Sequence, residues 1–404
     1  MQHFAVVQSL CRLGLQTQDP AFRQQVERLR EHLEKAGDTK DAETLTRLLK
    51  ATPNTVELAP TKVELSRFHI TGEPLTAQVH PPVDRETSQP LCRIVMSPAA
   101  QTQTQRPILT DRGNKAVTDL IAEWSTFERL QELGVAPGRS CLIFGPPGAG
   151  KTLTAFHIAA ALGLPVVDAR IDGLISSFLG TTARNIANLF SFANRYRCLL
   201  LLDEFDAIAK LRDDPQEVGE IKRVVNSLLQ SLDARADIGI TIAITNHHRL
   251  LDTAVWRRFD TQLQLTLPDV AARTQMLGVF LKPLPVNQPL IQLMTYVTDG
   301  TSGADLRRFS NAIKRQIALA GREATPTNQF KALCEVLARE PSTRVHPRAL
   351  RMIDDIEAFV REAMHDPDFP VKQKPLATLL SVNQATVSRW LTRAAITPGA
   401  AHAQ

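Results

Sequence analysis

The chain has 404 residues, of which 43% are hydrophobic and 22% charged, and this composition excludes a mainly disordered protein. A net charge of +5 over this length is too small to indicate nucleic-acid binding by itself. Five scattered cysteines without a CxxC pair favour a reducing compartment. The N-terminus does not resemble a signal peptide, and no apolar run approaches the ~18 residues that span a bilayer. We therefore expect a cytoplasmic protein with no membrane partner.

The first segment, residues 1–55, has helical spacing. Asp19 and Pro20 predict a helix start, because aspartate caps free N–H groups and proline needs no hydrogen bond at the first helical position. The apolar residues that follow at helical spacing are Phe22, Val26, Leu29 and Leu33. A shorter pattern at residues 42–49 predicts a second helix folded back on the first. One such hairpin buries too little alone, so it must pack on a partner chain or on the rest of the protein.

Four further regions follow. Residues 56–106 hold two β-like stretches, 62–70 and 91–96, among prolines and glutamines, and form either a small β element or an ordered linker. Residues 107–268 alternate strand-like runs with helical periodicity, which predicts a parallel sheet covered by helices. The expected strands are residues 140–144, 165–169, 198–202, 239–245 and 261–266. Residues 269–340 are helical throughout, and a helical C-terminal domain is expected at residues 345–396.

The segment GPPGAGKT at residues 145–152 satisfies the phosphate-loop pattern GxxxxGK[ST]. It follows an apolar strand and opens a helix, which is the context that the pattern requires. The glycines would let backbone N–H groups face the β- and γ-phosphates of ATP, Lys151 would add its charge, and Thr152 would ligate Mg²⁺. The residues expected to bind the nucleotide here are Gly145, Pro146, Pro147, Gly148, Ala149, Gly150, Lys151, Thr152 and Leu153.

Polar residues end the two strands that complete such a site. Asp203 and Glu204 follow the apolar run 199–202; Asp203 would bind the nucleotide-bound Mg²⁺, and Glu204 would accept the proton of the attacking water. Asn246 ends the next strand, where its amide can orient that water and sense the γ-phosphate. Each residue alone could be an ordinary strand end or turn residue. Their order after the phosphate loop favours the ATP site.

These motifs, with the segments after them, resemble the AAA clade of AAA+ ATPases over about residues 110–335. The segments that look like the second region of homology of this clade are residues 220–233, 245–246, 251–252 and 256–260. Gly303, Ala304 and Asp305 resemble its lid motif, in which a Gly-Ala pair packs near the adenine and replaces the sensor arginine of other clades. The resemblance implies an α/β P-loop domain followed by an all-α lid, with Mg²⁺-dependent ATP hydrolysis.

The resemblance has two weak points. Ala149 stands where the family often has threonine, which should be harmless because that position contributes its backbone. Around Asp111, Arg112 and Gly113 the chain matches the adenine-pocket region of the family only loosely. The residues that contact the base on that side are therefore left unassigned.

The resemblance also implies that Arg257 and Arg258 are arginine fingers that reach the γ-phosphate of a neighbouring subunit. Two adjacent guanidinium groups are seldom buried without an anionic partner, so they must lie at a surface or a site; the alternative is a solvated basic turn. An arginine supplied in trans can be worth ~10³–10⁵ in rate, so hydrolysis should require assembly. The family implies a homo-oligomeric ring, usually a hexamer.

Phe178 and Leu179 stand where unfoldases of the clade carry an aromatic pore loop that grips an extended polypeptide. Residues 180–186 match the family stretch after that loop, which favours engagement of a protein substrate. The alternative is that Phe178 is simply packed between apolar neighbours. Phenylalanine in place of the commoner tyrosine keeps the stacking surface.

The C-terminal segment, residues 375–391, looks like a helix-turn-helix. From residue 371 onward the chain has lysine and arginine but no aspartate or glutamate. The residues of the second helix that suit base edges and phosphates are Gln384, Thr386, Ser388, Arg389 and Arg393. Such units also serve as protein-docking or capping modules, so the choice between DNA and protein stays open. One helix would bind DNA usefully only with the avidity of a ring.

The sequence thus predicts a ring-forming AAA-type ATPase that couples ATP hydrolysis to remodelling or unfolding of a macromolecule, foremost a protein. The alternative is a DNA-associated ATPase switch or recruiter that uses the C-terminal segment. An inactive nucleotide-binding scaffold is disfavoured by Glu204 and the arginine pair. The layout resembles bacterial stand-alone AAA proteins, some of which accompany a protease, but the sequence contains neither a GxSxG nor an HExxH motif.

Overall fold

The structure, a computed structural model, divides into two units, Met1–Ser66 and Arg67–Gln404. The described residues are 7–9, 11, 20–35, 37–51, 72–99, 106–135, 138–170, 179–207, 218–235, 238–251, 253–321, 323–339 and 346–392.

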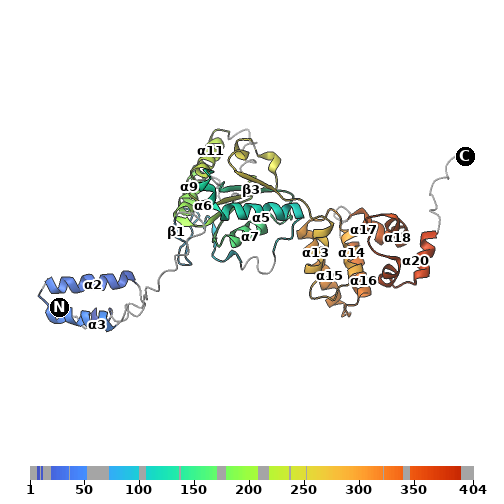
Figure 1. Cartoon of the computed structure of the whole chain (residues 1–404), viewed down its shortest axis with the longest axis horizontal. Helices are drawn as coiled ribbons and strands as arrows, with labels where there is room; N and C mark the ends of the chain where they lie inside the picture. Colours follow the sequence, from blue (N-terminus) through green and yellow to red (C-terminus); the bar gives the residue numbers. More distant parts are fainter. Residues whose placement is uncertain are drawn as a thin grey trace. The chain divides into compact units, whose positions relative to one another are not determined.

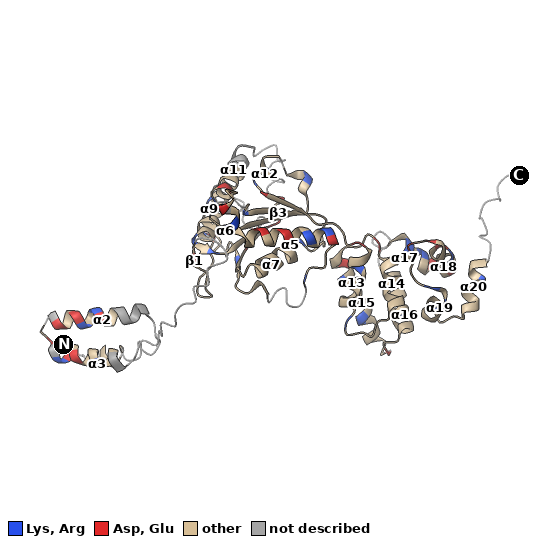
Figure 2. Cartoon of the chain, in the orientation of Figure 1, with Lys and Arg blue, Asp and Glu red and all other residues tan. Residues whose placement is uncertain are grey.

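The first unit contains a helical hairpin formed by α2 (Pro20–Lys35) and α3 (Thr39–Ala51). Helix α2 begins at Pro20, as predicted. The turn between the helices uses Gly37, whose φ of 82° suits a glycine after a helix end, and Asp38 N–H donates to Leu33 O. The buried residues of the hairpin, joined by Cys11, are Val26, Leu33, Ala42, Leu45 and Leu49. Basic and acidic residues are interspersed along α2 (Figure 2). Packing of the hairpin on another surface stays a prediction.

The second unit contains a six-stranded sheet of order β2-β4-β6-β7-β3-β8. Figure 1 labels β3 of this sheet, with helices such as α5 (Asp111–Ser125) and α7 (Lys151–Ala161) packed beside it. The strands are β2 (Arg93–Val95), β3 (Ser140–Phe144), β4 (Val166–Arg170), β6 (Leu199–Asp203), β7 (Thr241–Thr245) and β8 (Thr261–Gln264). All pairs are parallel except β2 with β4. The α/β fold is therefore confirmed, and the five predicted strands are present with ends displaced by at most two residues.

The sequence did not decide whether residues 56–106 form a small β element or an ordered linker. In the structure, the stretch 91–96 supplies the edge strand β2. The other β-like stretch, 62–70, lies outside the described residues. A separate two-stranded ladder pairs β1 (Glu73–Pro74) with β5 (Tyr196–Arg197) in parallel.

Helices cover both faces of the main sheet. Leu199 and Leu201 of β6 share one core with α5 and α7. Leu200 and Leu202 point the other way, as alternate strand residues must, and share a second core with α9 (Leu179–Arg195) and α11 (Val218–Arg235). A sheet that is buried on both faces requires the continuous apolar runs that the sequence shows. The short elements are α6 (Phe127–Glu132), η1 (His248–Leu250) and α12 (Thr253–Trp256).

The remaining helices share one hydrophobic core that runs from Met276 to Val387. They are α13 (Val270–Phe280), α14 (Gln288–Val297), α15 (Gly303–Leu319), α16 (Pro326–Arg339), α17 (Pro347–Asp354), α18 (Ile356–His365), α19 (Gln373–Leu380) and α20 (Gln384–Thr392). Side-chain caps start five of them: Asp269 for α13, Asn287 for α14, Ser302 for α15, His346 for α17 and Asp355 for α18. Among the helices of the described chain, none is long and apolar enough to cross a membrane.

Tyr296 of α14 ties the first of these helices to the later ones. Its hydroxyl donates to Asp366 Oδ2 at 2.7 Å, and the guanidinium of Arg348 lies 4.1 Å from the ring centroid. Burial, together with this hydrogen bond to a carboxylate, raises the pKa of Tyr296 to about 12. The contact joins α14, α17 and the end of α18 through one polar cluster beside the shared core.

Candidate functional site

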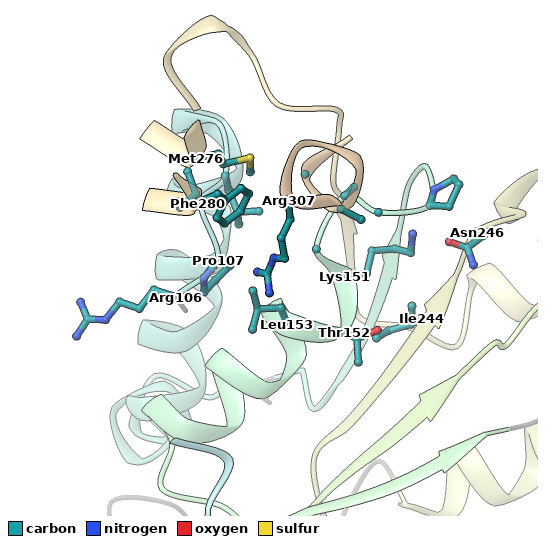
Figure 3. A pocket seen from close by; sticks show the side chains of 18 of the residues that line it. Arg106, Pro107, Lys151, Thr152, Leu153, Ile244, Asn246, Met276, Phe280 and Arg307 are labelled. Atoms are coloured by element: carbon teal, nitrogen blue, oxygen red, sulfur yellow. The ribbon is translucent and has the colours of Figure 1, made fainter. Parts of the chain in front are cut away.

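A cavity of about 740 Å³ lies at the carboxyl ends of β3, β6 and β7, beneath the start of α15 (Figure 3). Parallel sheets place ligands at this edge. The lining is formed by residues 106–109 and 147–153, by Asp203, Glu204, Ile244 and Asn246, and by Gln275, Met276, Val279, Phe280, Gly303, Ala304 and Arg307. The predicted phosphate loop, both carboxylates, the strand-end asparagine and the Gly-Ala pair are thus brought to one place. Gly145 and Pro146 do not line the cavity.

The phosphate loop needs glycine at two positions for different reasons. Gly145 has φ 150°, and a Cβ there would lie 2.0 Å from the carbonyl oxygen of Leu265. Gly148 has φ 75°, and its Cβ would lie 2.5 Å from Ser302 Oγ. The first glycine lets the loop leave β3 directly against the residue after β8. The second lets the loop touch the cap of α15.

Lys151 is 6% exposed and forms the first residue of α7. Its Nζ donates to the carbonyl oxygens of Gly145 at 2.9 Å and Pro146 at 2.8 Å. Burial lowers the pKa of Lys151, and the nearby carboxylates of Asp203 and Asp206 oppose that change. The ammonium group is therefore held at a helix N-terminus, where backbone N–H groups also favour an anion.

Thr152 and Asp203 form the pair with the chemistry of a magnesium site. Thr152 Oγ1 donates to Asp203 Oδ2 at 3.1 Å, and the other carboxylate oxygen, Oδ1, accepts from Glu204 N–H at 2.8 Å. Mg²⁺ in nucleotide sites uses one or two protein oxygens and takes its other ligands from phosphate and water. A hydroxyl and a carboxylate at the mouth of a phosphate loop fit that requirement.

Glu204 has φ 55°, in the left-handed region that residues other than glycine rarely adopt. Such a conformation is retained only where the surroundings hold it, and it is common at functional sites. Here Phe205 N–H donates to Ile244 O at 2.8 Å, which fixes the chain just after the turn. The turn places Glu204 in the cavity lining together with Asn246 from the neighbouring strand.

Asp206 is a buried carboxylate that the sequence analysis did not single out. It is 4% exposed, and its Oδ1 accepts from Thr245 Oγ1 at 3.2 Å. Together with Asp203 it raises the pKa of Lys151 against the effect of burial. A second aspartate three residues after the first was the available signal. Asp206 thereby links the turn after β6 to the residue before Asn246.

The start of α15 rests on the phosphate loop. Ala304 N–H donates to Gly148 O at 3.2 Å. A Cβ on Gly303 would lie 3.3 Å from Met276 Cε and 3.4 Å from Gly148 O, so a larger side chain would push the helix away. The Gly-Ala pair therefore lets the helix approach the loop closely enough for a backbone hydrogen bond.

One end of the cavity is apolar, and the sequence analysis missed most of it. The apolar side chains there are Pro107, Ile108, Leu109, Leu153, Met276, Val279 and Phe280. Residues 106–109 lie immediately before α5, a few positions upstream of the loosely matching segment at Asp111. The apolar run of proline, isoleucine and leucine before Thr110, the N-cap of α5, could have indicated this part of the cavity lining. Arg307 on α15 was also missed.

The arginine pair lies outside the cavity, and the two residues differ. Arg257 is exposed, whereas Arg258 is half-buried. Arg258 Nε donates to Asp233 Oδ2 at 3.1 Å, and its Nη1 donates to Ala254 O at 2.8 Å. The turn itself is anchored by Asp260, whose Oδ2 accepts from Ser140 Oγ at 2.7 Å. Arg258 is thus held by its own chain, while Arg257 projects from a fixed turn.

The predicted pore-loop residues and the predicted DNA-contact residues lie partly outside the described residues. Phe178 and the side chain of Leu179 lie outside the described residues, as does Arg393. Helices α19 and α20 are joined at Ser381, whose φ is 57°. On α20, Gln384 and Arg389 are exposed, and Thr386 and Ser388 are half-buried. The pore loop and the DNA contact stay predictions.

Comparison with known proteins gives the family. The model for the ATPase family associated with various cellular activities (AAA) matches residues 141–267, which include the phosphate loop and both carboxylates. The chain is 36% identical over 304 residues to y4kL, an uncharacterized AAA family ATPase of Sinorhizobium fredii, and the match covers 74% of this chain and 85% of y4kL.

Two further relatives match over a shorter stretch. The ATP-dependent zinc metalloprotease FtsH 3 of Sphaerobacter thermophilus is 33% identical over 61% of this chain and 52% of its own length. The proteasome-activating nucleotidase of Saccharolobus solfataricus is 34% identical over 45% of this chain and 48% of its own length. The chain therefore spans about half the length of these two proteins. Because the match to y4kL extends over most of both chains, this protein belongs to the AAA family of ATPases and is an ATP hydrolase.

Proposed function

We propose that the chain assembles into a ring in which a neighbour completes each ATP site, and that the ring uses ATP hydrolysis to remodel or unfold protein substrates. One observation carries this proposal. The cavity gathers Lys151, Asp203, Glu204 and Asn246, but the exposed Arg257 does not line it. A site for phosphoryl transfer needs cationic stabilisation of the transferring group, and a second copy of the chain can supply it.

Within one subunit, the cavity residues divide the work. The N–H groups of the loop and Lys151 bind the β- and γ-phosphates. Thr152 and Asp203 would hold Mg²⁺, which offsets phosphate charge when it is bound. Glu204 accepts the proton of the attacking water, and Asn246 orients that water. Positioned proton transfer of this kind contributes ~10²–10⁴ in rate.

Between subunits, Arg257 would approach the γ-phosphate of the neighbour. Its guanidinium is free to do so, since among the described residues the side chain of Arg257 has no hydrogen bond or ion pair. Arg258 has the other role, because Asp233 and the carbonyl of Ala254 fix it within its own chain. We assign Arg257 as the finger and Arg258 as the residue that stiffens the turn from which Arg257 projects.

Mixed assemblies test this division directly. The Arg257→Ala variant keeps its own Glu204 but lacks the finger, and the Glu204→Gln variant keeps the finger but lacks the base. Each variant alone should lose ATPase activity by ~10²-fold or more. Mixed after dissociation, they should regain activity, because each Glu204→Gln subunit can donate Arg257 to an intact site. A mixture no more active than the sum of its parts would overturn the trans arrangement.

The matched control is Arg315→Ala, an exposed arginine of α15 away from the cavity. It should keep wild-type activity alone and in mixtures. Native mass spectrometry of Glu204→Gln with ATP then gives the subunit number. A monomer in that experiment would contradict the ring.

A protein substrate is supported by the names of two relatives, a metalloprotease and a proteasome-activating nucleotidase, and by the predicted pore loop at Phe178. A permanently unfolded polypeptide should stimulate the ATPase of the wild type. The Phe178→Ala variant should lose this stimulation and keep its basal rate. Stimulation by duplex DNA, with none by polypeptide, would overturn the proposal in favour of the DNA-associated switch.

A further inference from the structure

Arg307 lies one helical turn after the Gly-Ala pair on α15 and lines the cavity. Figure 3 shows its side chain directed from α15 into the cavity towards Leu153, whereas Arg106 is directed away from it. We propose that the guanidinium of Arg307 stacks on the purine base of the bound nucleotide, with the ring of Phe280 on its other side. Because this role needs a nucleotide in the same cavity, it rests on the proposed function.

The surroundings of Arg307 do not neutralise it. Among the described residues, the side chain of Arg307 forms no ion pair or hydrogen bond. Its guanidinium carbon lies 4.9 Å from the centroid of the Phe280 ring. Arg308, the next residue, donates to Asp305 Oδ1 at 3.3 Å instead. Partial burial lowers the pKa of Arg307. A planar cation that covers an aromatic ring keeps its second face and its edge N–H groups for a ligand.

The two ends of the cavity decide which part of a nucleotide Arg307 meets. The phosphates belong at the loop amides and Lys151, since the helix N-terminus and the ammonium group lie there. The rest of the molecule must then extend past Leu153 to the apolar end. Figure 3 shows Pro107, Leu153, Met276 and Phe280 at that end, on the same side as Arg307. Arg307 lies on this side in Figure 3, beside Leu153 and away from Asn246.

Stacking here would also connect base binding to the position of α15. That helix already touches the phosphate loop through the hydrogen bond from Ala304 N–H to Gly148 O. A second contact one turn later, through the base, would fasten the helix to both ends of the nucleotide. The contact involves the part that ATP and ADP share, so Arg307 should stabilise both complexes equally.

Calorimetric titration of the full chain tests the assignment, with ADP on the wild-type background and ATP on the Glu204→Gln background. Arg307→Ala should weaken the binding of both nucleotides by about tenfold, which lies between the effects of an exposed and of a desolvated cation–π contact. Arg307→Lys should restore little, because lysine keeps the charge and loses the stacking plane. Inorganic tripolyphosphate has no base to stack on Arg307. It should therefore compete with ADP with the same affinity in the wild type and in Arg307→Ala. Arg308→Ala is the control and should bind as the wild type does.

Three results would overturn the role of Arg307: unchanged ADP affinity in Arg307→Ala, recovery in Arg307→Lys, or a loss confined to ATP. The last two would indicate a phosphate contact. Failure of the nucleotide site on which the proposed function depends looks different, because the wild type would then bind no nucleotide, or Lys151→Ala would bind it normally. Unchanged thermal unfolding of Arg307→Ala confirms that the variant is folded.

Discussion

The ring of Trp256 meets the ring of Phe144 edge to face, with centroids 5.1 Å apart and planes at 84°. The ring of His248 lies 4.9 Å from that of Phe144 and 6.4 Å from that of Trp256. Phe144 is the residue before the phosphate loop, His248 follows the strand-end asparagine by two positions, and Trp256 precedes the arginine pair. One aromatic cluster therefore connects three motifs that are separate in sequence.

This cluster predicts the effect of Trp256→Ala. The arginine turn would lose its contact with the start of the phosphate loop, so Arg257 would be misplaced relative to the neighbouring site. We expect kcat to fall by ~10²-fold, the size of effect that a 1 Å misplacement produces. The affinity for ADP should change little, because Trp256 does not line the cavity. Trp256→Phe should recover most of the rate, and an equal loss of ADP affinity and kcat would contradict this role.

Asp233→Ala tests the role of Arg258 separately from stability. The ion pair between them is partly exposed, with side chains 30% and 53% accessible, so its removal should cost no more than about 1 kcal/mol of unfolding free energy. The ATPase rate should nevertheless fall, because the turn that carries Arg257 loses its inner support. Glu362→Ala, which removes the exposed pair with Arg351, is the matched control. If both variants retain full activity, Arg258 does not position its neighbour.

A comparison of Gly148→Ala with Gly321→Ala distinguishes a steric clash in the phosphate loop from backbone strain alone. A Cβ at this position meets Ser302 Oγ at 2.5 Å, so α15 must move off the loop and nucleotide affinity should fall at least tenfold. Gly321 also has positive φ, 58°, but nothing lies within 4 Å of its Cβ position. Gly321→Ala should therefore lose only about 1–2 kcal/mol of stability from strain and keep its affinity, as ADP titration and denaturant unfolding would show. Equal affinities in both variants would argue against the contact.

The sequence predicted the parts of this site that are local. Lys151, Asp203 and Asn246 each follow a recognisable apolar strand, and parallel strands bring their ends to one edge. Arg307 and Phe280 could not be found in this way, because their place depends on how α13 and α15 pack against the loop. Helical periodicity marks both residues only as members of amphipathic helices.

Arg235 shows the same limit within the sheet domain. An arginine in the last turn of a helix normally faces water, yet Arg235 is 1% exposed. Its guanidinium donates to Asn194 Oδ1 at 2.9 Å, to Cys198 O at 3.1 Å and to Thr241 Oγ1 at 3.2 Å. These acceptors come from α9, from the residue between β5 and β6, and from β7. No local sequence pattern predicts these acceptors. Only the folded structure shows that the Arg235 guanidinium forms its hydrogen bonds within the protein.

Tyr296 gives a prediction about alkaline stability. Its pKa in the folded protein, about 12, lies above its ordinary value of 10.0. The proton is therefore held more tightly in the folded state, so the stabilisation is complete below pH 10.0 and is lost as the pH rises towards about 12. Tyr296→Phe removes the hydroxyl that donates to Asp366 and should cost about 1 kcal/mol at neutral pH.

The pH dependence distinguishes this hydrogen bond from loss of packing alone. Between pH 8 and pH 11 the denaturant midpoint of the wild type should fall more than that of Tyr296→Phe, because the variant has no phenol there to ionise. Tyr196→Phe is the control, since Tyr196 is the other of the two tyrosines and its hydroxyl forms no hydrogen bond within the described chain. It should retain the wild-type slope. Parallel curves for wild type and Tyr296→Phe would show that the contact with Asp366 does not hold the proton, and that the ring stabilises the helices only through its packing against Phe359 and Phe369.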